Sequence, residues 1–175
     1  MIFNKQQMET VNKAVSMAEE LVSNHFKMSA SQWLHPKYDV KTLKDLGPEE
    51  IVEGPFAQII RYEGKRKGSQ LGSGSYDFYK ICLQDQTILK ILDQTQKITL
   101  LPFCLYVITH ELVHIVRFSK FLQSFKATSE EKVNEERRVH ALTREILGPV
   151  SIVGLPQVIE YFHDWLMPLE DLGNQ

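Results

Sequence analysis

The sequence predicts an α+β protein in which a small, mostly antiparallel sheet packs on a buried helix and further helices dominate the second half. Three observations lead to this expectation. One helical pattern opens the chain, two strand patterns follow it, and a long apolar helix with partner helices ends it. Because the strands form one block between helical blocks, we expect a small sheet covered by helices.

The amino-terminal helix is predicted over residues 4–26. Its apolar residues repeat at spacings of three and four, which is the period of one helix face. They are Met8, Val11, Val15, Ala18 and Val22. Residues 30–55 contain several prolines and glycines and are predicted to be irregular, with a short helical turn opened by Pro48.

Two strands are predicted at 56–62 and 76–83, where aromatic and β-branched residues are frequent. Between them, residues 64–75 hold four glycines and three consecutive cations. We expect a solvated hairpin tip there, and the alternative is a flexible substrate or phosphate contact. Residues 87–92 fit a third strand or a short helix, and periodicity does not choose between them.

Length and composition are those of one globular domain, predicted to span residues 1–175. The chain has 175 residues, 43% hydrophobic and 24% charged, so it can bury an ordinary core. Its net charge of −2 argues against a nucleic-acid partner. Cys82 and Cys104 both lie in apolar runs and are expected to be buried free thiols. With no signal core and no apolar run of about 18 residues, we expect a cytoplasmic protein without a membrane partner.

The most informative stretch is His110-Glu111-Leu112-Val113-His114, which reads H-E-x-x-H within a long apolar segment. We expect a helix from a cap at Thr99 to about Phe125. Positions one turn apart lie on the same helix face, so both imidazoles can reach one metal ion. Burying these polar groups without partners would be costly, and a bound cation removes that cost. The alternative is a core helix whose histidines are satisfied by hydrogen bonds.

A third metal ligand is expected on a second helix, predicted over residues 129–147 behind a cap at Thr128, because catalytic zinc sites usually take three protein ligands. Glu136, Glu135 and His140 can all face inward beside the apolar stripe of this helix. At least one of the three is expected to bind the metal. The alternative is that both glutamates pair with neighbouring arginines on a solvated face.

These residues resemble the zincin metallopeptidases, and among them the gluzincins, which carry H-E-x-x-H on one helix and a glutamate ligand on a following helix. The resemblance implies Zn2+ held by His110, His114 and Glu136, with Glu111 as the general base of peptide hydrolysis. His140 is then a residue that orients a ligand or an alternative ligand, and Glu135 is a further alternative. Peptide or protein substrates are implied, and such proteins lay them along a sheet edge.

The resemblance covers about residues 100–149 and departs from known patterns in two places. In the thermolysin-like pattern, Asn-Glu is followed four positions later by Asp. Asn134-Glu135 fits the first part, but position 139 is Val, whereas Glu136 has a polar residue, His140, at that offset. The chain also resembles, more loosely, the small bacterial ImmA/IrrE-like peptidases, through the segment 145–149. That register places Arg138 at the glutamate position of this group.

Three other functions remain open at this stage. The chain can be a catalytically inactive zincin-like scaffold that acts as a binding or regulatory protein. The spacing of Glu111 and His114 also occurs in di-iron carboxylate proteins, but Glu136 to His140 is one residue too long for the matching pair. A protease of DNA-bound proteins is supported only by the short basic loop. The sequence leaves the natural substrate and the oligomeric state open.

Overall fold

Helix α4 (Leu100–Ser119) is the central element of the computed structural model, which describes residues 1–29, 38–65, 75–120 and 127–163. Every residue of α4 from Pro102 to Arg117 is buried. Among the described residues it is the one helix long and apolar enough to cross a membrane, and 89% of its apolar window is buried inside the protein. A helix that is apolar on all sides needs neighbours on all sides.

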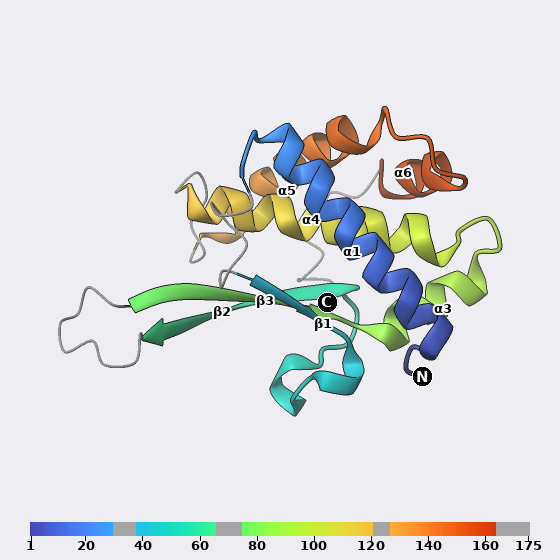
Figure 1. Ribbon diagram of the computed structural model, residues 1–175, viewed down its shortest axis with the longest axis horizontal. Helices are drawn as coiled ribbons and strands as arrows, with labels where there is room; N and C mark the ends of the chain where they lie inside the picture. Colours follow the sequence, from blue (N-terminus) through green and yellow to red (C-terminus); the bar gives the residue numbers. More distant parts are fainter. Residues whose placement is uncertain (30–37, 66–74, 121–126, 164–175) are drawn as a thin grey trace.

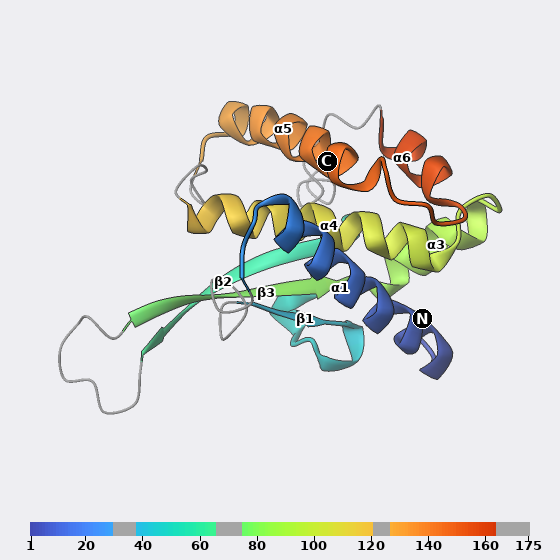
Figure 2. The ribbon, with the colours of Figure 1, turned by 45° about the horizontal axis from the view of Figure 1, so that its top comes forward.

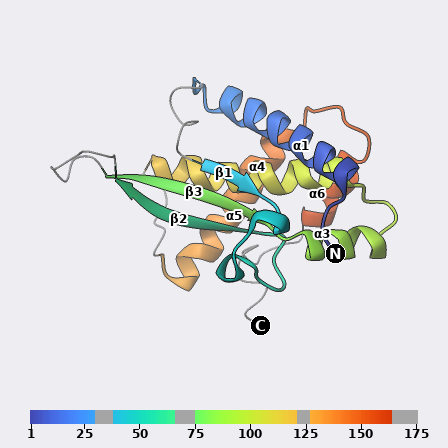
Figure 3. The same cartoon turned by 60° about the horizontal axis from the view of Figure 1, so that its bottom comes forward.

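The sheet has three strands, β1 (Tyr38–Lys41), β2 (Ala57–Lys65) and β3 (Ser75–Leu83), in the order β1-β3-β2. Strands β2 and β3 are antiparallel, whereas β1 runs parallel to β3 (Figure 3). The sheet is therefore mixed, with the long antiparallel hairpin that the sequence predicts. The predicted helical turn at Pro48 is confirmed as a short 3-10 helix (Pro48–Glu50), but the prediction that the rest of 30–55 is irregular is wrong, because it contains β1. All four residues of β1 are half-buried, so this strand carries no alternating pattern.

Helix α1 (Lys5–His25) confirms the amino-terminal prediction. Asn4 accepts a hydrogen bond from the Gln7 backbone N–H at 2.8 Å, and the Gln7 side chain accepts one from the Asn4 N–H at 2.8 Å. These two bonds satisfy backbone donors that a helix start leaves open. The buried face of α1 is narrow and consists of small residues, which allows close contact with α4. Its members are Val11, Ala14, Ala18 and Val22.

Helix α5 (Ser129–Leu147) lies beside α4 and has the bounds that the sequence predicts (Figure 2). The Thr128 side chain accepts a hydrogen bond from the Glu131 N–H at 3.2 Å and starts the helix. Helix α4, in contrast, ends at Ser119 instead of near Phe125, and residues 121–126 lie outside the described part. The Thr99 side chain makes no capping hydrogen bond.

Two shorter α-helices and two 3-10 helices, η1 (Leu43–Asp45) and η2 (Pro48–Glu50), complete the described fold. The segment that fitted either a strand or a helix is helical, as α3 (Asp85–Gln94), and α6 (Leu155–His163) packs on α4 and α5. Figure 1 shows the sheet on one side of α4 and helices α5 and α6 on the other. The predicted glycine-rich tip lies mostly outside the described residues. The structure is therefore α+β, as expected.

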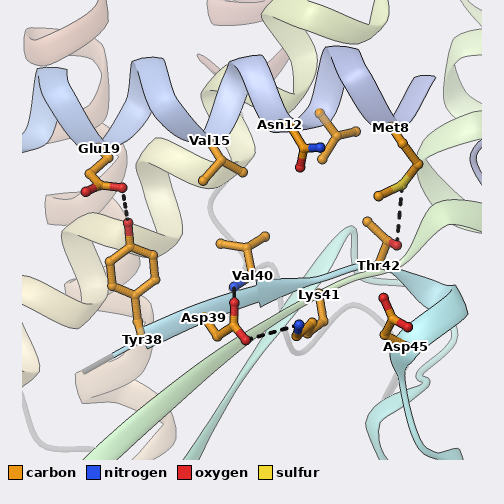
Figure 4. A pocket seen from close by; sticks show the side chains of 11 residues that line it. Met8, Asn12, Val15, Glu19, Tyr38, Asp39, Val40, Lys41, Thr42 and Asp45 are labelled. Atoms are coloured by element: carbon orange, nitrogen blue, oxygen red, sulfur yellow. Dashed lines mark hydrogen bonds and ion pairs between the residues drawn. The ribbon is translucent and has the colours of Figure 1, made fainter. Parts of the chain in front are cut away.

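A groove runs between α1 and β1, with a cavity of about 380 Å3 (Figure 4). At one end, the Tyr38 hydroxyl donates a hydrogen bond to Glu19 Oε2 at 2.8 Å. At the other end, the Thr42 hydroxyl lies 3.5 Å from the Met8 sulfur. Asp39 pairs with Lys41 along the strand at 3.3 Å. The groove therefore has a polar contact at each end and a charged pair on its strand.

Candidate metal centre

The two histidines of H-E-x-x-H meet the same glutamate of α5 across the α4–α5 contact. His110 Nε2 lies 2.9 Å from Glu136 Oε2, and His114 Nε2 lies 2.8 Å from Glu136 Oε1. The helical spacing of one turn places both rings on the face of α4 that α5 covers. None of the three side chains is more than 2% exposed. Of the inward-facing residues on α5, Glu136 is thus the one whose carboxylate contacts both imidazoles.

His140 joins this group from the next turn of α5. Its Nε2 lies 3.6 Å from Glu136 Oε2, and its ring centroid is 4.4 Å from that of His110. One ligand atom from each of His110, Glu136 and His140 falls within 4.8 Å of the others. The other ring nitrogen of His140, Nδ1, lies 2.7 Å from the Tyr106 hydroxyl. The sequence placed His140 near the centre but did not predict its contact with Tyr106. The signal was the position of Tyr106 one helical turn before His110, on the same face of α4.

Glu111 lies on the opposite side of the His110 ring. Its Oε1 is 3.2 Å from His110 Nδ1, so the carboxylate holds the nitrogen that faces away from Glu136. Glu111 Oε2 is buried and has no hydrogen-bond partner among the described residues. The side chain is fully buried. One carboxylate oxygen therefore orients a candidate ligand, as often occurs beside metal-bound histidine, and the other is uncommitted.

Glu135, the alternative ligand, is engaged elsewhere. The Arg117 Nε donates to Glu135 Oε1, its terminal nitrogen lies 3.3 Å from Oε2, and Arg138 lies 3.4 Å from Oε2. Glu135 is 8% exposed, so this is an almost buried ion pair between α4 and α5. Neighbouring residues on a helix point about 100° apart, which is why one glutamate meets the arginine and the other meets the histidines. The pairing with Arg138 anticipated for an uninvolved glutamate thus occurs at Glu135.

Charge balance in the cluster follows from burial and from the carboxylates. Burial lowers the pKa of His110, but Glu136 and Glu111 outweigh burial and raise this pKa to about 9. Burial raises the pKa of Glu136, but His114 and His110 outweigh it and hold this pKa below its ordinary value. Burial and the charge of His110 lower the pKa of His140 to about 3. A proton on His110 therefore helps to balance the carboxylate of Glu136.

The donor set and its spacing fit a zinc ion. Imidazole nitrogen and carboxylate oxygen bind zinc at about 2.0–2.2 Å in a tetrahedron, which puts neighbouring ligand atoms about 3.3 Å apart. Glu136 Oε2 lies 2.9 and 3.6 Å from the Nε2 atoms of His110 and His140, and Glu136 Oε1 lies 2.8 Å from His114 Nε2. The buried His140 Nε2 has no hydrogen-bond partner among the described residues. Such an atom is costly without a partner, and a cation among these residues supplies one.

Comparison with known proteins adds no family to this picture: no family model, no curated protein and no solved structure matches the chain. The chemistry of the centre therefore has to be argued from its own residues. In the described chain, one donor atom each of His110, Glu136 and His140 lies within 4.8 Å of the others. His114 and Glu111 join this buried cluster through their contacts with Glu136 and His110, and Glu135 lies beside it in an ion pair.

Proposed function

We propose that the chain is a zinc-dependent metallopeptidase of zincin type. The observation that carries the proposal is the carboxylate of Glu136, which contacts the Nε2 atoms of both His110 and His114. Two histidines and a glutamate form a common ligand set of hydrolytic zinc sites. Zinc, when bound, acts as a Lewis acid that acidifies water and polarises a carbonyl oxygen.

Glu111 is the general base in this proposal. Its Oε2 has no hydrogen-bond partner among the described residues, so it is the oxygen assigned to accept the proton of the attacking water. The water oxygen bonds to the carbonyl carbon of the peptide, and the C–N bond then breaks as Glu111 gives the proton to the leaving amine. In the structure Glu111 Oε1 lies near His110 Nδ1, on the side of the ring away from Glu136, so the Glu111 side chain has to turn towards Glu136 for this step.

A second candidate is a zincin-like scaffold that binds metal and acts as a binding or regulatory protein without turnover. One observation favours it: no side chain of the cluster is more than 2% exposed. A hydrolase has to admit both water and a peptide to its metal. A closed polar cluster suits a structural metal equally well. The two candidates share the ligands and differ in the role of Glu111.

The test combines metal analysis with hydrolysis of a quenched fluorescent peptide library by the zinc-loaded full chain. A peptidase binds one zinc per chain, and Glu111→Gln keeps the zinc but loses roughly 100- to 10,000-fold in rate. Glu145→Gln, on the exposed face of α5, is the matched control and keeps both properties. Zinc binding without hydrolysis, both in the wild type and in His140→Ala, which removes a buried imidazole beside the metal site, favours the scaffold. No zinc even when it is supplied overturns both candidates.

A further inference from the structure

The His140 side chain presents one ring nitrogen to the proposed metal centre. The residue is 1% exposed, and its Nε2 has no hydrogen-bond partner among the described residues although it lies 3.6 Å from Glu136 Oε2. At 3.6 Å this is no hydrogen bond. If His140 only oriented a ligand, it would need such a bond. Nε2 is instead directed at the group of donor atoms from His110 and Glu136.

Tyr106 fixes the direction of that nitrogen. The Tyr106 hydroxyl lies 2.7 Å from His140 Nδ1, and the Tyr106 ring stacks on Phe162 with centroids 4.3 Å apart and planes 2° apart. Tyr106 and Phe162 are both fully buried, so the pair is held by the core. When Nδ1–H donates to the tyrosine oxygen, the lone pair of a neutral His140 is on Nε2, the form that binds metal.

We propose that His140 is a fourth protein ligand of this centre, oriented by Tyr106, so that the resting metal is closed by His110, His114, Glu136 and His140. The inference rests on the proposed zinc site and deepens it. A metal with four protein ligands has no position for water. Hydrolysis then requires one ligand to leave, and His140 is the candidate because the other three form the ligand set of a hydrolytic site. The proposed centre is thus latent, meaning that it is inactive until His140 leaves the metal, and this agrees with the burial of its side chains.

The ligand count is measured by X-ray absorption at the zinc edge on the zinc-loaded full chain. Three imidazoles in the wild type support the proposal, and two overturn it. His140→Ala is expected to show two imidazoles and to lose more than about 100-fold in zinc affinity, measured by competition with a chromogenic chelator, because a ligand matters more than a residue that orients one. His163→Ala removes an exposed imidazole and is the matched control, with unchanged affinity.

Tyr106→Phe tests the orientation while keeping the stacking on Phe162. It is expected to keep three imidazoles and to lose roughly 10- to 100-fold in zinc affinity. An unchanged affinity overturns the role of Tyr106. If latency holds, His140→Ala also gains peptide hydrolysis per bound zinc over the wild type. The two proposals fail differently: a chain that takes up no zinc overturns both, whereas zinc held by two imidazoles and a carboxylate overturns only the fourth ligand.

Discussion

Two buried carboxylates, Asp85 and Glu136, are satisfied in different ways. Asp85 is 1% exposed and accepts hydrogen bonds from the backbone N–H groups of Phe3 and Leu43, both at 2.9 Å. It therefore ties the amino-terminal segment and the turn after β1 to the start of α3. Glu136 is 2% exposed, and its contacts are imidazole nitrogens. Backbone donors cannot bind a metal, whereas imidazoles can exchange their protons for one.

Glu50, at the end of the 3-10 helix Pro48–Glu50, differs from Glu136 in the same way as Asp85 does. Its carboxylate accepts hydrogen bonds from Gly47 N–H, Tyr62 hydroxyl and Lys80 ammonium at 2.8–2.9 Å. Every contact comes from a donor that stays a donor at neutral pH. In the α4–α5 cluster, by contrast, Glu111 Oε2 and His140 Nε2 have no hydrogen-bond partner among the described residues. Burial alone thus does not distinguish these carboxylates, and the proposed metal site rests on the two buried ligand atoms that have no hydrogen-bond partner among the described residues.

The largest effect that separates the two kinds of carboxylate is stabilisation by zinc. At a free zinc concentration about 1,000 times Kd, binding adds about 4 kcal/mol to the free energy of unfolding. For a chain of this size, that raises Tm by roughly 10 °C. Glu136→Gln is expected to lose most of this rise, and Glu135→Gln, its neighbour in the ion pair, to keep it. Scanning calorimetry with and without zinc measures the rise in Tm for each variant. Equal rises in the two variants would contradict a metal-binding role that Glu136 has and Glu135 lacks.

A smaller effect is expected at Asp85, and it should not depend on zinc. Asp85→Ala leaves two backbone N–H groups without their acceptor, which lowers the free energy of unfolding by about 3 kcal/mol. Asp93→Ala, at an exposed position of the same helix, is the control and stays within about 0.5 kcal/mol of the wild type. Urea unfolding with zinc and with chelator measures the loss. A loss that appeared only in the zinc-loaded protein would contradict a purely structural role.

The smallest effect concerns Glu50 and appears only in acid. The hydrogen bond from Lys80 and that from Gly47 lower the pKa of Glu50 from 4.5 to about 2. Between these values the unfolded chain binds a proton that the folded chain does not, so the stabilisation is present above pH 4.5 and is lost as the pH falls to about 2. Glu50→Gln should reduce the slope of the urea midpoint against pH between pH 5 and about 3. Glu49→Gln, at an exposed position, should leave this slope unchanged. An unchanged slope in Glu50→Gln contradicts the assignment.

Local sequence patterns predicted most of the secondary structure and half of the candidate site. Helical periodicity and capping residues placed α1 and α5, and the high frequency of aromatic and β-branched residues placed β2 and β3. The motif placed His110 and His114 on one helix face, because residues four apart in a helix always lie one turn apart. Strand β1 was not predicted, because its four residues lie among prolines and glycines and are all half-buried, with no alternation between buried and exposed positions.

The sequence by itself determined the two histidines, the helix that carries them and the short list of residues from which further ligands are proposed. Only the tertiary structure showed that Glu136 contacts the histidines while Glu135 pairs with Arg117, and that Tyr106 contacts His140. The physical reason is the rotation of α5 about its own axis, which the packing of Val139 and Leu147 in the shared core sets. A sequence repeat fixes which residues share a face of one helix, but the face that meets another helix depends on packing between residues far apart in the chain.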